Sequence, residues 1–350
     1  MKLTKSIMIL TILLTLLGCS EATDEASKPR EVLLQGLTMG TVAYSVKLIV
    51  KPEDSIVNGQ QKFNRGGVHA EIETILKQLN QDMSNWIPDS ELSRFNSSTS
   101  LEPMEISSGL SRVIAESLRL GALSNGKLDV TVGPLVNLWG FGPEQRPERV
   151  PTDEELAVAK ARVGLQHLSL SGNQLTKAIP NLYIDLSTIA KGYAVDLLAE
   201  AMERRGINNY LVEVGGEMRV KGFKHTGELW AVAIEKPISE ERLVHQVIVP
   251  KDNALATSGD YRKYFEAEGQ RFSHIIDPDT GKPINHKIVS VTVIHPSSMT
   301  ADGLSTSMML MGEDKAYDFA MKNDIAAYII SKTDNGFKEQ ITVKFMPYLK

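Results

Sequence analysis

RFSHIIDPDTGKPINHKIVSVTVIHPSSMTADGLSTSMMLMG, residues 271–312, contains the clearest structural signals of this chain. Its runs RFSHII and IVSVTVI are rich in β-branched and aromatic residues, which favours strands. Between them, Asp277–Gly281 combines Asp, Pro and Gly, the residue types of tight turns. Asp302 then precedes an apolar run that predicts a helix over Gly303–Met311. The segment therefore predicts a strand, a turn, a second strand and a helix in succession.

The remaining sequence mixes helix and strand signals without a regular strand–helix–strand rhythm. We expect helices around Ile72–Leu79 and Leu110–Leu120, and over Asp153–Val163 and Ser187–Arg205. Strands are expected within Val32–Val50, YLVEV, WAVAIE, LVHQVIVP, Ala326–Ile330 and Ile341–Phe345, with a hairpin turn at Gly215 and Gly216. This pattern indicates the α+β class, with largely antiparallel sheets and packed helices in one domain over residues 31–350.

Composition and charge limit the classes of function. A hydrophobic content of 42% in 350 residues supports a sizeable core. The net charge is -5, and Lys and Arg form no cluster of the kind that binds phosphate backbones. We therefore expect no nucleic-acid partner.

The N-terminus carries an export signal. Two lysines precede the apolar run Ile7–Leu17, which is too short to span a bilayer. The run ends in LLGC, which resembles the lipobox of bacterial lipoproteins, cleaved before the cysteine and acylated on it. We expect a signal peptide over residues 1–18, lipidation at Cys19, and a flexible tether over residues 19–30. An ordinary signal peptide that ends in Cys is the alternative.

Asp302 and the hydroxyls that follow it form the first candidate metal site. Ser305 and Thr306 lie about one helical turn after Asp302, so their oxygens could join its carboxylate as hard ligands for Mg²⁺ or Ca²⁺. Such a site would keep positions open for phosphate oxygens. The alternative is structural, with Asp302 as a helix cap and the nearby methionines as core.

The segment IDLSTIAKGYAVD, residues 184–196, repeats this theme. In the functional interpretation Asp185 accepts hydrogen bonds from a ligand, Thr188 lies near the metal, and the helix N-terminus faces an anion. In the structural alternative Asp185 or Ser187 caps the helix and Lys191 is solvated. A diphosphate needs more positive charge than one lysine supplies, which favours joining both segments around a single divalent ion.

His274 and several aromatic residues complete the candidates. His274 lies in the strand-like run RFSHII, where most histidines are structural, but its ordinary pKa suits a general base for an alcohol. Trp86, Trp139 and Phe141 fit the core, although the Gly- and Pro-rich segment 126–143 would also suit a loop shaped around a flat ring.

Several motifs, taken in order, carry a resemblance to a known family. They are MGT at 39–41, MSNWIPDSELSRFN at 83–96, LDVTVGPLVNLWGFGP at 128–143, DLSTIAKGYAVD at 185–196, VEVGGE at 212–217, ATSGDYR at 256–262, SHIIDPDTGKP at 273–283 and TADGLSTSMM at 300–309. Together they resemble the ApbE family of FAD:protein FMN transferases. The resemblance covers nearly the whole mature chain and implies a T-fold-like catalytic domain with a central cleft.

The resemblance implies a function and assigns residues to it. Family members use Mg²⁺ to transfer FMN from FAD to a Thr or Ser hydroxyl of an acceptor protein through a phosphoester, releasing AMP; Ca²⁺ is a conceivable substitute. By resemblance His274 and Asp302 are catalytic, and the metal ligands are Thr188, Asp302, Ser305 and Thr306. The FAD site is lined by Met39, Trp86, Lys127, Leu128, Asp129, Asp185, Lys191 and Ile276.

The resemblance also implies partners and a location. Acceptors would be subunits of membrane redox complexes that pump Na⁺ or H⁺. The protein would be lipid-anchored on the periplasmic side of a Gram-negative-type cell envelope, with the inner membrane favoured. The alternatives are a periplasmic FAD pyrophosphatase that releases FMN and AMP, and a flavin-binding lipoprotein without catalysis.

Overall fold

The computed structural model describes residues 28–51, 63–144, 149–237, 243–260, 264–267 and 269–350. The expected signal peptide and lipidated Cys19 lie outside these residues. An eight-stranded antiparallel sheet forms the centre, in the order β1-β2-β6-β7-β10-β13-β14-β15. Its strands are β1 Arg30–Thr38, β2 Val42–Val50, β6 Tyr210–Val214, β7 Glu217–Lys221, β10 Ala254–Gly259, β13 Ile288–His295, β14 Ala326–Thr333 and β15 Gly336–Ile341.

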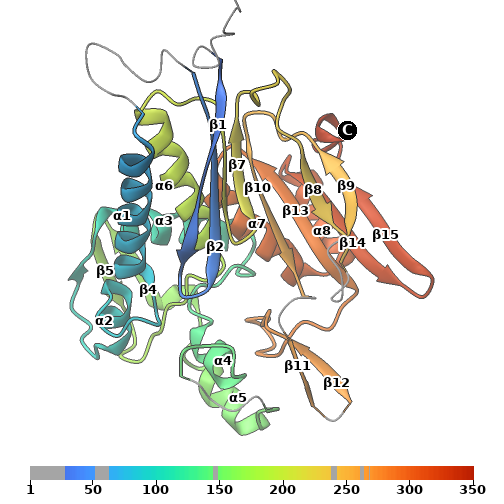
Figure 1. Cartoon of the computed structure of the whole chain (residues 1–350). Helices are drawn as coiled ribbons and strands as arrows, with labels where there is room; N and C mark the ends of the chain where they lie inside the picture. The colour runs from blue at the N-terminus through green and yellow to red at the C-terminus, as the bar shows by residue number, and fades with distance from the viewer. Residues whose placement is uncertain (1–27, 52–62, 145–148, 238–242, 261–263, 268) are drawn as a thin grey trace, which may run out of the picture.

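Helices cover one face of this sheet, and smaller sheets extend the domain (Figure 1). The helices are α1 Arg65–Met83, α2 Glu91–Ser97, α3 Ser108–Leu123, α4 Gly133–Leu138, α5 Asp153–Lys160, α6 Ala190–Arg204, α7 Ser298–Met311 and α8 Glu313–Lys322, with single 3₁₀ turns at Leu165–His167 and Met346–Tyr348. The smaller sheets contain β3 Met104–Glu105, β5 Gln174–Lys177 and β4 Leu168–Ser171; β8 Val232–Glu235 and β9 Val244–Ile248; and β11 Tyr264–Ala267 and β12 Gln270–Ser273. This confirms the α+β class.

Side chains of the central sheet alternate between two hydrophobic cores. In β14, Ala327 and Ile329 join the larger core shared with α1, α3, α6 and α7, whereas Tyr328 and Ile330 join a second core on the opposite face. Because successive strand residues point to opposite faces, both faces of this strand are buried. The second core includes Trp230, which precedes β8 in the chain, and Ile248, the last residue of β9.

A third hydrophobic cluster holds α4, α5 and the β11–β12 hairpin together. Trp139, Phe141 and Phe265 are buried there, with the Trp139 and Phe272 ring centroids 5.4 Å apart. In Figure 1 these elements lie together at the end of the molecule opposite the N-terminal part of β1. Segment 126–143 is therefore not only a loop as expected, because it includes α4.

Several expected boundaries were wrong. The helix expected at Gly303 begins at Ser298, and the one expected at Ser187 begins at Ala190. The strand expected over Ile341–Phe345 is misplaced, because β15 spans Gly336–Ile341. Arg30, assigned to the tether, already pairs with Val50 in the central sheet. The strands within Val32–Val50 and the hairpin turn at Gly215 are confirmed.

Candidate functional site

Asp302 lies inside α7 and does not cap it. Ser297 is the cap, because its side chain accepts a hydrogen bond from the Thr300 amide. Asp302 follows in the second turn and is only 2% exposed. Its Oδ2 accepts a 3.0 Å hydrogen bond from the Gly192 amide in the first turn of α6. The structural alternative for Asp302 as a helix cap is therefore wrong, and the carboxylate lies at the contact between two helices.

An ammonium group and a second buried carboxylate accompany Asp302. Lys191 Nζ lies 2.8 Å from Glu217 Oε1 and 3.4 Å from Asp302 Oδ1. The Glu217 side chain is 4% exposed, whereas that of Lys191 remains 28% exposed. Lys191 is thus paired with two acids rather than simply solvated. When all three groups are ionised, the two carboxylates and one ammonium leave a net negative charge at this junction.

Burial and the neighbouring charges change the pKa values of this group. Burial raises the pKa of Asp302 to about 7; Lys191 opposes that rise and Glu217 adds to it. For Lys191, burial alone would favour the neutral amine, but the nearby Asp302 and Glu217 carboxylates outweigh it and raise its pKa above the ordinary value. The ammonium therefore persists, and a further positive partner would lower the pKa of Asp302.

Hydroxyl groups lie on α7 after Asp302, on β10 and in the turn before α6. Ser258 Oγ on β10 lies 2.7 Å from Ser305 Oγ and 3.1 Å from Thr306 Oγ1 on α7. Thr188 precedes α6 by two residues, and its Oγ1 is buried without a hydrogen-bond partner among the described residues. Because Lys191 and Gly192 both contact Asp302, the structure brings the Thr188 turn and Asp302 to the same junction.

The turn before α6 connects this junction to other candidate residues. Asp185 is 5% exposed, and its Oδ1 accepts a 2.8 Å hydrogen bond from the Ser187 amide. No side-chain hydrogen bond caps α6, so neither Asp185 nor Ser187 acts as its cap. The Asp185 amide donates to the Val130 carbonyl at 2.7 Å. This bond fixes the turn against the segment that contains Leu128 and Asp129.

Lys127 anchors the turn that follows His274. Its Nζ lies 2.9 Å from Asp277 Oδ1 and 2.8 Å from Asp279 Oδ2. The adjacent Leu128 is buried, and a Cβ added at Gly303, next to Asp302, would lie 3.3 Å from its Cδ2. Residues 127–128 therefore contact both the turn after His274 and the helix of Asp302.

Asp129 is committed to a local turn. Its Oδ1 accepts hydrogen bonds from the Thr131 amide at 2.7 Å and the Thr131 hydroxyl at 2.5 Å. Burial raises the pKa of Asp129, while these hydrogen bonds oppose the rise. The side chain therefore orders the segment before α4.

His274 lies within the expected strand RFSHII, but β12 ends at Ser273, so His274 is the first residue after the strand. It is half-buried, and its ring meets Phe141 edge-on with the ring centroids 6.3 Å apart. Ile276, two residues later, is 5% exposed and belongs to the third hydrophobic cluster. It also forms a β-bridge with Pro283 across the predicted Asp277–Gly281 turn. The aromatic cluster and the anchored turn together place His274.

Met39 and Trp86 lie in two other connections. Met39, with a φ of 47°, occupies the turn between β1 and β2 and packs against the main core. Trp86 is 59% exposed, so the expectation that it belongs to the core is wrong, while Trp139 and Phe141 are buried as expected. Its neighbour Asn85 hydrogen-bonds the Tyr183 side chain, two residues before Asp185.

The comparisons with known proteins establish the family of this chain. The sequence profile of the ApbE family matches residues 39–329. The chain belongs to the ApbE family. The FAD:protein FMN transferase of Vibrio cholerae is 50% identical over 98% of both chains, and that of Haemophilus influenzae is 49% identical over 96% of this chain and 95% of its own.

Solved structures extend this ApbE-family relationship to the fold. The flavin transferase ApbE from Vibrio cholerae matches with a TM-score of 0.84 and 50% identity, covering 92% of this chain and 100% of its own. The flavinyl transferase ApbE from Pseudomonas stutzeri, in an apo form, matches with a TM-score of 0.83 and 38% identity, covering 92% and 98% of the two chains.

Sequence reasoning missed two side chains that contact the candidate site residues. Glu217, which pairs with Lys191, and Ser258, which contacts Ser305 and Thr306, lie within the VEVGGE and ATSGDYR motifs. The sequence alone assigned them no role. The available signal was that Glu217 follows two glycines. Glycines have no side chain, so a ligand can approach the backbone beside Glu217 closely.

Two surface hollows of about 310 and 550 Å³ contain none of the candidate site residues, so the central cleft stays a prediction.

Among the described residues, no helix is long and apolar enough to cross a membrane.

Proposed function

We propose that this ApbE-family flavin transferase moves FMN from FAD to a Thr or Ser hydroxyl of an acceptor protein in an Mg²⁺-dependent reaction that releases AMP. The observation that carries the proposal is the junction of α6 and α7. There a buried carboxylate, Asp302, accepts a hydrogen bond from the Gly192 amide, four residues after Thr188, whose buried Oγ1 has no partner among the described residues. The family and its named relatives supply the reaction class.

The donor set fits Mg²⁺. The described residues contain no cluster of three or more His, Cys, Asp or Glu side chains placed to hold a metal. Mg²⁺ commonly uses one or two carboxylates together with substrate phosphates and water, so it needs no such cluster. Asp302, Thr188, Ser305 and Thr306 would hold the ion, with Ca²⁺ a possible substitute. When bound, Mg²⁺ would neutralise phosphate charge and polarise the phosphorus nearer the flavin.

His274 would act as the general base. In this step the acceptor hydroxyl gives its proton to the His274 ring, its oxygen forms a bond to the phosphorus nearer the flavin, and the bond from that phosphorus to the AMP oxygen breaks. Phe141 holds the ring from its edge, and the Lys127 ion pairs fix the following turn. These contacts would limit the directions from which the ring can accept the proton.

The remaining candidates would bind FAD around this centre. Exposed Trp86 offers a flat surface for ring stacking, and Met39 would line the FAD site from the turn between β1 and β2. The other residues that we propose for the FAD site are Lys127, Leu128, Asp129, Asp185, Lys191 and Ile276. Because Lys127 and Lys191 already pair with acids, we expect them to act partly by holding those acids in place.

The location and the acceptors belong to the same proposal. The apolar run Ile7–Leu17, which ends in LLGC, supports a lipid anchor at Cys19 on the periplasmic side, with the inner membrane favoured. A domain anchored there would reach the exposed loops of membrane redox complexes, the acceptors that we propose.

A test incubates the purified protein with FAD, MgCl₂ and an acceptor protein and measures the acceptor's mass. Addition of FMN to the acceptor with release of AMP supports the proposal. Free FMN and AMP without a modified acceptor would indicate a pyrophosphatase instead, and intact FAD would indicate a binding protein.

Two substitutions test the roles within the site. We expect Asp302→Ala and His274→Ala to lower the transfer rate at least 100-fold. Asp314→Asn on α8 and His225→Ala, both at exposed residues, are matched controls that should retain the wild-type rate. Full transfer by Asp302→Ala would contradict the metal assignment, and full transfer by His274→Ala would remove the proposed base.

A further inference from the structure

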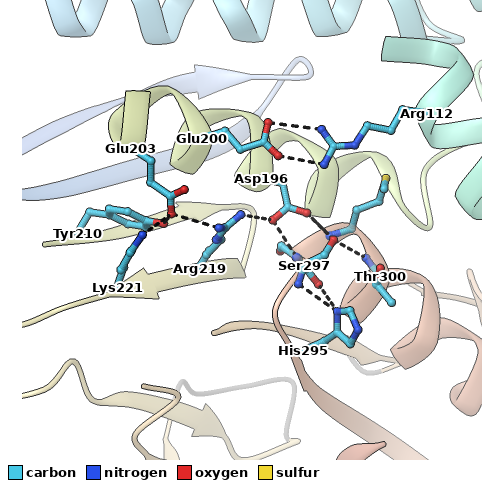
Figure 2. Close-up of polar contacts among 12 residues, drawn as sticks. Arg112, Asp196, Glu200, Glu203, Tyr210, Arg219, Lys221, His295, Ser297 and Thr300 are labelled. Carbon is cyan, nitrogen blue, oxygen red and sulfur yellow. Dashed lines mark hydrogen bonds and ion pairs between the residues drawn. The ribbon is translucent and has the colours of Figure 1, made fainter. Parts of the chain in front are cut away.

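Asp196 on α6 holds the beginning of α7. Its carboxylate accepts hydrogen bonds from the Ser297 hydroxyl at 2.6 Å, the Ser298 amide at 3.0 Å and the Met299 amide at 3.0 Å. Arg219 of β7 donates a fourth, at 3.2 Å. Asp196 is 1% exposed, and Figure 2 shows these contacts converging on it. A single carboxylate thus satisfies two backbone amides and the Ser297 hydroxyl at the start of the helix that carries Asp302.

Each of the two helices supplies a carboxylate that binds the first turn of the other helix. Asp196 of α6 binds the first turn of α7, while Asp302 of α7 accepts from the Gly192 amide in the first turn of α6. Between these contacts the backbones touch, because a Cβ added at Gly192 would lie 2.3 Å from the Ser298 carbonyl oxygen. The contacts lie on successive turns of both helices. Sliding or rotation of α7 would therefore break both.

A further layer of charges holds Asp196 itself. Arg219 also pairs with Glu203 at 3.2 Å, and Glu203 accepts from Tyr210 at 2.7 Å and pairs with Lys221 at 3.3 Å (Figure 2). The Arg219 side chain is 20% exposed, so solvent screens this pair only partly. The network connects β6 and β7 to α6, which fixes Asp196 relative to the strand that carries Glu217.

We propose that Asp196 is a positioning residue, which locks the first turn of α7 against α6 and thereby sets the place of the Asp302 carboxylate. The inference rests on the proposed function, in which Asp302 binds Mg²⁺. Asp196 acts through the helix, because its described hydrogen bonds are to Arg219 and to residues at the start of α7.

The test compares Asp196→Asn with Glu200→Gln. Glu200 lies one turn further along α6 and pairs with Arg112 at 3.0 Å, but has no described contact with α7, so it controls for loss of an acid from the same helix. Three properties are measured: unfolding by denaturant, hydrogen exchange of the α7 amides, and binding of MgCl₂ to the metal-free protein by calorimetry. Ser297→Ala is a milder second variant, with Ser297→Thr as its conservative rescue.

Asp196→Asn should exchange the amides of 298–305 at least 10-fold faster and bind MgCl₂ at least 10-fold more weakly, while Glu200→Gln stays within twofold of wild type. If Asp196→Asn does not fold, the same comparison between Ser297→Ala and Ser297→Thr decides, with smaller changes of the same sign. A folded variant in which either property stays within twofold of the control overturns the inference.

Failure of the inference is distinguishable from failure of the proposed function. Asp302→Ala is titrated with MgCl₂ in the same series. Weakened binding by Asp302→Ala beside unchanged binding by Asp196→Asn overturns the inference alone. Unchanged binding by Asp302→Ala contradicts the metal assignment itself, and with it the site that Asp196 is proposed to position.

Discussion

Replacing Thr188 with Val should stabilise the metal-free protein and weaken its function. The Thr188 Oγ1 atom is buried and has no hydrogen-bond partner among the described residues. An unsatisfied buried hydroxyl costs about 1–3 kcal/mol, and an apolar group of the same shape removes that cost. Val has nearly the same shape and the same branching at Cβ, so backbone preference changes little. We expect the free energy of unfolding to rise by about 1 kcal/mol.

Thr342→Val is the matched control with the opposite sign. Thr342 is 1% exposed, and its Oγ1 donates to the Ile325 carbonyl at 2.9 Å and accepts from the Ala327 amide at 2.9 Å. The same substitution there leaves two buried backbone groups with one partner fewer, which should cost about 1–3 kcal/mol. The two variants remove the same atom, so the opposite signs would come only from hydrogen bonding.

The assay is denaturant unfolding of both variants in a chelator, followed by titration with MgCl₂ and measurement of flavin transfer. Thr188→Val should need at least 10-fold more Mg²⁺ for half-maximal transfer, whereas Thr342→Val should need the same amount as wild type. A Thr188→Val protein that is less stable than wild type without metal would show that its hydroxyl already has a partner. Unchanged Mg²⁺ dependence would remove Thr188 from the proposed ligands.

Three further predictions concern other contacts. Gly192→Ala should destabilise the protein by about 1–3 kcal/mol in denaturant unfolding, because its Cβ would meet backbone atoms, whereas Gly67→Ala in α1, whose Cβ meets nothing closer than 3.8 Å, should not. Burial lowers the pKa of Lys177 to about 8, so between pH ~8 and ~10.5 the unfolded chain binds a proton that the folded protein does not. The free energy of unfolding of the wild type should therefore rise across this range, by at most about 1.4 kcal/mol per pH unit. The rise should be absent in Lys177→Met. Lys127→Met should slow transfer at saturating Mg²⁺ without changing Mg²⁺ affinity, because it releases Asp277 but not Asp302; a lowered Mg²⁺ affinity would refute that separation.

Local patterns predicted the elements well, because their causes are local. The β-branched residues of IVSVTVI and the Gly-Gly turn at Gly215 act on their neighbours in sequence, and both β13 and the β6–β7 hairpin are confirmed. Helix starts were harder to place. Ser298 and Thr300 look like loop residues, yet they begin α7 because Ser297 and the distant Asp196 satisfy its first amides.

Contacts between distant segments could not be predicted from local patterns. Lys127 pairs with an aspartate 150 residues later, and Lys191 meets Asp302 only because α6 packs against α7. Trp86 illustrates the converse, since a large aromatic residue usually belongs in a core but here is 59% exposed. The sequence therefore proposed residues for the candidate site, but it could not show which contacts hold them in place.

Hydrogen-bond capacity separates a structural acid from a functional one in this pair of helices. An ionised carboxylate can accept about four hydrogen bonds. Asp196 has four donors, so its capacity is used within the fold. Asp302, also buried, has only the Gly192 amide and the Lys191 ammonium among the described residues. A buried carboxylate with unused capacity is costly unless a further positive partner joins it, and burial has already raised its pKa to about 7. Of the two acids, Asp196 and Asp302, Asp302 is therefore the one suited to bind a cation.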